Sequence, residues 1–197
     1  YIETFLKIQT KDGKLIPLKF NEAQDKLYNT FAQCYNQNVP CKIIVLKARQ
    51  LGISTATEAI IYALTNLNMY MSALIVAHET DASTNVFNMS KRYYDNLPQQ
   101  LRPMIKYSNA KELRFENPVR DDKNPGLRSN IRVATAGKSG VGRSATFNFM
   151  HLSELAFCPE QDGKNVQDQL TGILQTLPQQ GFSFLVIEST ANGYNYF

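Results

Sequence analysis

Features that mark membrane, secreted and metal-binding proteins are scarce in this sequence. No apolar run approaches the roughly 20 residues that a helix needs to cross a bilayer, and the first residues lack the basic and apolar regions of a signal peptide. The three cysteines lie far apart, which indicates neither a disulfide framework nor a metal site. We expect reduced, mostly buried thiols at Cys34, Cys41 and Cys158.

The bulk composition is ordinary for a globular protein. The chain has 197 residues, of which 43% are hydrophobic and 19% charged, and this is typical of one domain with a substantial core. The sequence contains no low-complexity tract, internal repeat or Gly/Ser linker. A net charge of +4 permits anionic partners, but it is spread among many acidic residues and does not identify one.

Short apolar runs alternate with helical patterns along the chain. This alternation predicts a doubly wound α/β fold with a parallel core, and the run 41–46 fits a buried strand. Residues 106–131 differ, because their polar–apolar alternation and Asn-Pro turns indicate an antiparallel insertion. The predicted strands are 41–46, 73–77, 131–134, 147–152 and 182–187, and the predicted helices are 21–35 with Asn21 as N-cap, 54–67, 81–97 and 165–177.

The loop 47–55, between a predicted strand and a predicted helix, is a candidate phosphate-binding loop. The standard motif is G-x-x-x-x-G-K-[ST], in which backbone N–H groups and a helix N-terminus hold phosphates. Gly52 and Ser54 fit this pattern, whereas Lys47 replaces the first glycine and Ile53 replaces the lysine. Lys47 could supply the cation near the phosphates, with Arg49 as a second one. Ser54 or Thr55 could supply a hydroxyl for Mg²⁺. By itself, the loop is equally compatible with an ordinary strand–turn–helix connection.

Two other features are assigned no catalytic role. Gly137-Lys138-Ser139 matches the end of the standard motif, but it lacks the upstream glycine, and a strand follows where a helix should begin. His78 and His151 lie at or within predicted strands without a partner spacing for a metal, so we expect packed or hydrogen-bonded side chains there.

Residues 49–55 resemble the deviant Walker A motif of the large terminase subunits of tailed bacteriophages, which are DNA-packaging motors. In several members the lysine stands at the start of the loop, as Lys47 does. Residues 20–24 resemble the family's adenine-recognition segment, and residues 149–154 resemble its Walker B strand, with Ser153 in place of the usual aspartate. The resemblance assigns nucleotide binding to Gln24, Lys47, Arg49, Gln50, Leu51, Gly52, Ile53, Ser54 and Thr55, and Mg²⁺ binding to Ser54 and Ser153.

The same resemblance assigns the remaining roles in catalysis. Glu154 matches the catalytic glutamate that orients and deprotonates the attacking water. Arg143 matches an arginine that acts on the ATP of a neighbouring subunit. Residues 187–193 resemble the coupling motif, which assigns responses to the γ-phosphate to Ser189, Thr190 and Asn192.

The resemblance implies an additional-strand, RecA-like P-loop NTPase over residues 1–197, with a mainly parallel sheet flanked by helices. It further implies a Mg²⁺-dependent ATPase, in the host cytoplasm and without a membrane anchor, that drives double-stranded DNA into a procapsid. Implied partners are other copies in a ring on the portal, the portal protein and the small terminase subunit. Nothing in the sequence resembles the family's nuclease domain, so no nuclease activity is expected.

Two alternatives remain open at this stage. Ile53 and Ser153 depart from the standard motifs, which would suit a nucleotide-binding module that no longer hydrolyses ATP. The basic residues Lys47 and Arg49 would also suit a DNA-binding module that contacts the phosphate backbone.

Overall fold

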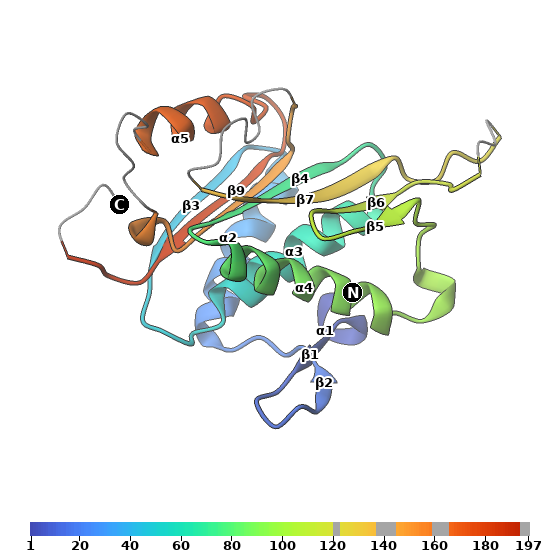
Figure 1. The fold of residues 1–197 in the computed structure, drawn as a ribbon, viewed down its shortest axis with the longest axis horizontal. Helices are drawn as coiled ribbons and strands as arrows, with labels where there is room; N and C mark the ends of the chain where they lie inside the picture. The colour runs from blue at the N-terminus through green and yellow to red at the C-terminus, as the bar shows by residue number, and fades with distance from the viewer. Residues whose placement is uncertain (120–122, 137–144, 159–165, 194–197) are drawn as a thin grey trace.

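A computed structural model describes residues 1–119, 123–136, 145–158 and 166–193. The described residues form three layers, with a sheet between helices on its two faces (Figure 1). Helices α2 (Glu22–Gln37), α3 (Ile53–Leu67) and α4 (Thr80–Asn96) cover one face, and α5 (Val166–Leu174) covers part of the other. In this part of the chain, no helix has both the length and the apolar character needed to cross a membrane.

The central sheet of the described residues has seven strands and is mainly parallel. Its order is β3 (Cys41–Leu46), β9 (Phe184–Ser189), β8 (Phe149–Ser153), β4 (Ser72–Ala77), β7 (Ser129–Thr135), β6 (Glu112–Phe115) and β5 (Tyr107–Ser108). The first five strands are parallel, and β6 and β5 continue the sheet in antiparallel pairing. These two strands confirm the predicted antiparallel insertion. β9 separates β3 from β8, as the additional-strand prediction requires.

The first 20 residues form small elements that the sequence patterns did not predict. They comprise α1 (Ile2–Phe5) and an antiparallel pair of strands, β1 (Lys7–Gln9) and β2 (Leu15–Pro17). Each strand has three residues, and none of them is buried, so no hydrophobic periodicity marks them. Two short 3₁₀ segments, Gln99–Leu101 and Leu155–Phe157, complete the described elements.

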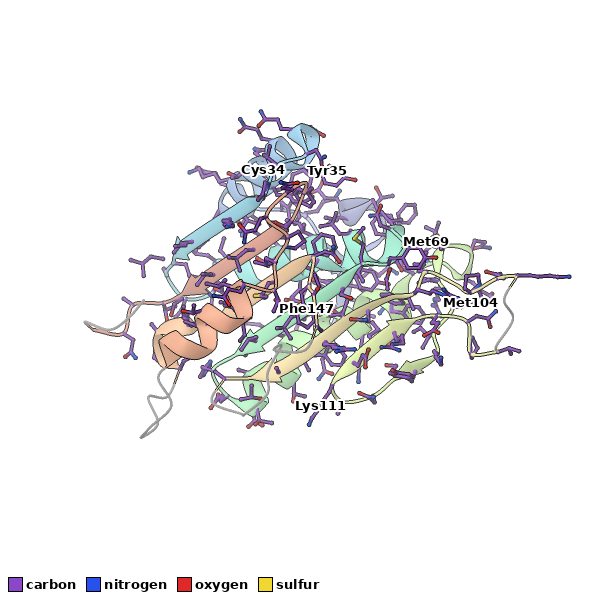
Figure 2. All side chains as sticks on the ribbon, turned by 90° about the horizontal axis from the view of Figure 1, so that it is seen from above. Cys34, Tyr35, Met69, Met104, Lys111 and Phe147 are labelled. Carbon is purple, nitrogen blue, oxygen red and sulfur yellow. The ribbon has the colours of Figure 1, made fainter. Side chains whose placement is uncertain are left out.

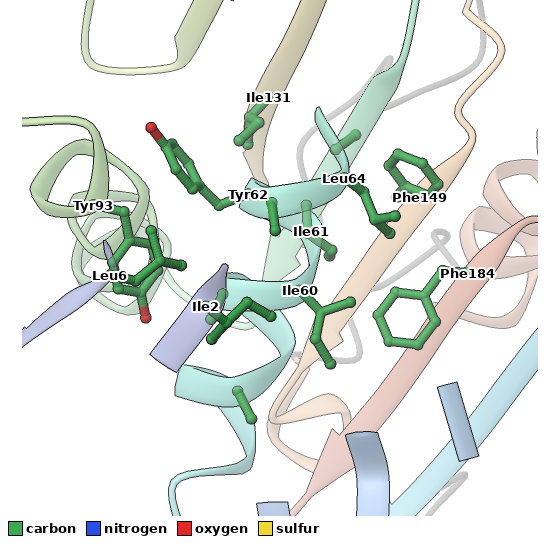
Figure 3. Packing of buried hydrophobic residues seen from close by; sticks show 14 of the residues in the cluster. Ile2, Leu6, Ile60, Ile61, Tyr62, Leu64, Tyr93, Ile131, Phe149 and Phe184 are labelled. Atoms are coloured by element: carbon green, nitrogen blue, oxygen red, sulfur yellow. The ribbon is translucent and has the colours of Figure 1, made fainter. Parts of the chain in front are cut away.

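Two apolar clusters hold the layers together. The larger one lies between the sheet and α2, α3 and α4, and α3 is buried on nearly all sides because it lies beneath the middle of the sheet (Figure 3). The smaller one lies between α5 and β4, β8 and β9, and it includes the buried Phe147 (Figure 2). This packing fixes the position of α3 relative to β3, which precedes it in the chain, and β4, which follows it.

Several expectations about individual elements need correction. β8 and β9 each begin two residues later than predicted. Phe147 instead packs in the α5 cluster, and the Phe182 ring packs edge-on against Phe31 of α2. β3 was predicted to be buried, but it is an edge strand. Its Ile44 and Leu46 are 72% and 68% exposed, because α5 does not cover β3. All three cysteines are free, but only Cys41 is buried, while Cys34 and Cys158 are half-buried.

Helix α3 offers a direct test of this core. Leu64 and Leu67 lie about one turn apart, and they are 7% and 55% exposed. We predict that Leu64→Ala lowers the free energy of unfolding by about 2–5 kcal/mol, because a buried cavity remains, whereas Leu67→Ala changes it by about 0.5 kcal/mol or less. Urea denaturation of both variants measures this, and equal losses would contradict the placement of α3.

Candidate active site

The predicted site residues meet at the carboxyl ends of β3, β9 and β8. Val45, Glu188, Ser153 and Ala77 form one row across these strands and β4, so the residues that follow them leave the sheet at the same edge. In open α/β sheets, ligands bind in the crevice beyond this edge. Here a cavity of about 490 Å³ is lined by Lys47, Arg49, Gln50, His78, Glu154, Phe157 and Thr190.

The loop 47–55 has a backbone that only certain residues tolerate. Gln50 and Gly52 have φ values of 66° and 73°, in the left-handed region that favours glycine. A Cβ atom on Gly52 would lie 2.5 Å from Nε2 of Gln24. Gly52 is therefore required both for its φ and for the close approach of α2.

The N-terminus of α2 holds this loop in place. Asn21 and Gln24 form a capping box, with Asn21 N donating to Gln24 Oε1 at 2.9 Å and Gln24 N donating to Asn21 Oδ1 at 3.0 Å. The two side-chain amides also donate to the loop, to the carbonyls of Leu51 at 3.1 Å and Gly52 at 2.8 Å. Gln24 is thus in contact with the loop, while its predicted contact with adenine stays a prediction.

The first turn of α3 separates the roles of three loop residues. Ile53 is buried in the core, so the position of the standard lysine faces away from the cavity. The Ser54 hydroxyl donates to Glu188 Oε1 at 2.6 Å. The carbonyl of Thr55 accepts from the Tyr93 hydroxyl at 3.2 Å. Of the two candidate hydroxyls, that of Ser54 therefore contacts a carboxylate.

Lys47 lies between two carboxylates. Its Nζ is 2.6 Å from Glu188 Oε2 and 3.1 Å from Glu154 Oε1, and its side chain is 8% exposed. Burial acts to lower the pKa of Lys47, but Glu188 and Glu154 raise it above its usual value. Lys47 is therefore a charged ammonium at the edge of the cavity, and its predicted contact with phosphate stays a prediction. Arg49 and Gln50 are exposed, and Gln50 accepts from Lys11 Nζ at 3.0 Å.

Glu154 has a strained backbone and a well-defined side chain. Its φ of 52° costs a residue with a Cβ roughly 1–2 kcal/mol. Its Oε2 accepts from Thr190 N at 3.0 Å and Thr190 Oγ1 at 3.1 Å. Burial acts to raise the pKa of Glu154, but the Thr190 amide and Lys47 lower it below its usual value. A strained residue held in this way at a cavity suits a catalytic role.

The predicted coupling residues contact the segment that begins at Glu154. Besides the bonds from Thr190, the Ser189 hydroxyl accepts from Ala156 N at 3.1 Å, and Asn192 Nδ2 donates to the Ala156 carbonyl at 2.9 Å. A displacement of β9's end would therefore act directly on Glu154. The predicted response of these residues to the γ-phosphate stays a prediction. Arg143 lies outside the described residues, as does Gly137-Lys138-Ser139.

Behind the site lie three buried polar residues to which the sequence analysis assigned no catalytic role, namely Glu58, His151 and Glu188. His151 is buried and hydrogen-bonded, as expected, with its Nδ1 2.6 Å from Glu58 Oε1 and its Nε2 3.3 Å from Glu188 Oε1. Ser153 Oγ donates to the same Glu188 oxygen at 2.9 Å. Glu58 and Glu188 could have been noticed, because each is the single charge within an otherwise uncharged helix or strand.

The side chains of this buried group shift one another's pKa values. Burial opposes ionisation of Glu188, but His151, Lys47 and Ser54 lower its pKa to about 2. Burial likewise opposes protonation of His151, but Glu188 and Glu58 raise its pKa to about 9. Burial raises the pKa of Glu58 despite its bond to His151. Glu188 is therefore an anion with positively charged neighbours on two sides.

Comparison with known proteins shows which fold this is. No family model matches the sequence. The large terminase of bacteriophage HK97 aligns with 95% of this chain at a TM-score of 0.64 and 16% identity. The large terminase ATPase domain of Thermus phage P74-26 aligns with 91% of this chain and 72% of its own (TM-score 0.55, 17% identity). A large terminase from a thermophilic bacteriophage, in complex with ADP, aligns with 86% of this chain and 38% of its own (TM-score 0.52, 11% identity).

The chain therefore has the P-loop, RecA-like fold of phage large terminase ATPase domains. This confirms the fold class predicted from the motifs. The chain spans 36% of the HK97 protein, so the match concerns one part of that protein.

The contact between Gly52 and Gln24 can be tested with two glycine variants. We predict that Gly52→Ala lowers stability by about 1–2 kcal/mol or more, because alanine is disfavoured at this φ and its methyl group would overlap Gln24. Gly172 in α5 has open space at its Cβ position, so Gly172→Ala should raise stability by roughly 1 kcal/mol. Thermal unfolding measures both, and an unchanged Gly52→Ala variant would contradict the loop conformation.

Proposed function

We propose that this chain is the ATPase domain of a phage large terminase subunit, and that it hydrolyses ATP to move double-stranded DNA into a procapsid in the host cytoplasm. One observation carries the proposal. In a fold shared with large terminase ATPase domains, the Lys47 ammonium and the Glu154 carboxylate converge on one cavity, next to the glycine-containing loop that begins α3.

The triphosphate of ATP fits the charged side of this cavity. Gly52 is the N-cap of α3, with no side chain capping the first turn in the described structure, and such N-termini attract phosphate. Lys47 and Arg49 line the same cavity. Phosphate oxygens would compete with Glu188 and Glu154 for the Lys47 ammonium, so nucleotide binding would separate Lys47 from at least one of them. Gln24 would read the adenine edge, as the resemblance implies.

The residues beside the loop also fit Mg²⁺, which prefers oxygen ligands and is usually held by one or two carboxylates together with substrate phosphates. The Ser54 hydroxyl and the Glu188 carboxylate lie 2.6 Å apart, and no group of three or more His, Cys, Asp or Glu in the described residues could hold a metal alone. When bound, Mg²⁺ would neutralise charge on the phosphates.

Glu154 would act as the general base. Its carboxylate is ionised, is held by Thr190 and opens onto the cavity. A water molecule attacking the γ-phosphorus would transfer a proton to Glu154 while the bond to the leaving ADP oxygen breaks. Because Ser189, Thr190 and Asn192 contact this segment, they would transmit the loss of the γ-phosphate to β9. Arg143 would act on the ATP of a neighbouring copy.

The proposed partners follow from the proposed role. They are double-stranded DNA, further copies of the chain in a ring on the portal, the portal protein and the small terminase subunit. Translocation of DNA requires the full assembly, so the activity of the chain alone is expected to be slow ATP hydrolysis.

The catalytic assignment predicts a loss of hydrolysis without a loss of binding. Glu154→Ala should lower the rate of phosphate release by about 10²- to 10⁴-fold, the contribution typical of a general base, while the nucleotide remains bound. Asp95→Ala, which removes an exposed carboxylate on α4, is the matched control and should keep the full rate. Equal phosphate release by Glu154→Ala and the unmodified chain would contradict the assignment.

Ligand protection separates the proposal from a DNA-binding module. Mg²⁺ and a non-hydrolysable ATP analogue should raise the midpoint of thermal unfolding, because they bind the folded state. If the loop 47–55 instead contacts the DNA backbone, the analogue should give no protection. Duplex DNA should then protect the chain, and this protection should decrease steeply with salt.

A further inference from the structure

The site contains a carboxylate beside the position where the usual aspartate is missing. Ser153 occupies that position, and a neutral hydroxyl does not supply the negative charge that P-loop proteins place beside the loop serine or threonine to hold Mg²⁺. On β9, the strand next to β8, Glu188 is the residue paired with Ser153. We propose that Glu188 supplies this missing carboxylate and binds Mg²⁺ together with Ser54. The inference rests on the proposed ATPase function.

The contacts of a single oxygen support this assignment. Glu188 Oε1 accepts from Ser54 Oγ at 2.6 Å and from Ser153 Oγ at 2.9 Å. The carboxylate from β9 therefore reaches both the loop hydroxyl and the residue that replaces the aspartate. A glutamate has one methylene more than an aspartate, so it extends further from its own strand.

The layer behind Glu188 holds it in this orientation. His151 Nε2 lies 3.3 Å from Glu188 Oε1, and His151 Nδ1 lies 2.6 Å from Glu58 Oε1. All three side chains are fully buried between α3 and the sheet. Partners of this kind orient the groups that bind a metal directly and are commonly required for its affinity.

Charge balance supplies an independent argument. Glu188 Oε2 is paired with Lys47 Nζ at 2.6 Å, and removing one partner of a buried ion pair is strongly unfavourable. If the phosphates of ATP draw Lys47 away, Glu188 keeps only His151, which it shares with Glu58. A divalent cation that arrives with the phosphates restores the balance. The site thus exchanges an ammonium for a metal ion when the nucleotide binds.

The competing explanation is that Glu188 only positions Lys47. The two roles differ in what they do to nucleotide binding without metal. Loss of a metal-binding carboxylate should leave affinity in EDTA unchanged or higher, because Lys47 is released for the phosphates. Loss of a group that positions Lys47 should weaken binding equally with and without Mg²⁺.

The experiment measures the dissociation constant of a fluorescent, non-hydrolysable ATP analogue in EDTA and in Mg²⁺. For the unmodified chain, Mg²⁺ should strengthen binding. In Glu188→Gln this gain should fall by at least about 10-fold, since the loss of an outer partner alone costs about 10- to 100-fold in metal affinity, with affinity in EDTA retained. Adding Ser153→Asp to Glu188→Gln should restore part of the gain, because it returns a carboxylate to β8. Glu112→Gln, which alters an ion-paired strand glutamate on β6, should keep all of it.

The other possible results of this experiment overturn either the inference alone or the ATPase proposal with it. An undiminished gain in Glu188→Gln, or equal weakening in EDTA and Mg²⁺, overturns the inference while leaving the ATPase proposal intact. Absence of nucleotide binding by the unmodified chain overturns the ATPase proposal, and this inference with it. Circular dichroism checks folding. If Glu188→Gln does not fold, Glu188→Asp, which keeps the charge but is one methylene shorter, should still lose part of the gain, and an unchanged gain there overturns the inference.

Discussion

The ion pairs of Lys47 with Glu188 and Glu154 connect the elements on which the site depends. Lys47 follows β3, Glu188 ends β9 and Glu154 follows β8, and the ammonium lies within 3.1 Å of both carboxylates. Removing one partner of a buried pair usually costs about 3–5 kcal/mol, so this arrangement ties three strand ends together. It also neutralises the lysine while no nucleotide is bound. In the proposed function, nucleotide binding would replace at least one of these contacts with a contact to phosphate, and this exchange of partners would be the central event at the site.

A layer of polar side chains inside the core lies behind the carboxylates that would exchange partners. Glu58, His151 and Glu188 are buried between α3 and the sheet and are linked by hydrogen bonds. Ser54 joins the layer to the first turn of α3. Because these hydrogen bonds join α3 to β8 and β9, a change of partner at Glu188 would affect α3 and β8 together. Ile53 and Ser153 replace the lysine and the aspartate of the standard motifs, so other residues would take over these two roles. We infer that the cation comes from the start of the loop and the carboxylate from the neighbouring strand.

The sequence was informative wherever local patterns decide structure. Helical spacing, the Asn21 cap and the apolar runs predicted the α/β fold and most elements. The exposed hairpin of residues 7–17 left no periodic signal. The exposure of β3 depends on its place at the end of the strand order and on where α5 packs, and its own residues encode neither. Glu188 was missed for a related reason. Its contacts with Lys47, Ser54 and Ser153 join residues that are 35 to 141 positions apart, and only the strand register brings them together.

The most direct test of this account is a structure of the chain with a non-hydrolysable ATP analogue and Mg²⁺. The account predicts that Lys47 Nζ contacts phosphate oxygens and has left at least one of its two carboxylates, while Ser54 and Glu188 lie beside the metal. Lys47 still paired with both Glu188 and Glu154, with the nucleotide bound elsewhere, would contradict it.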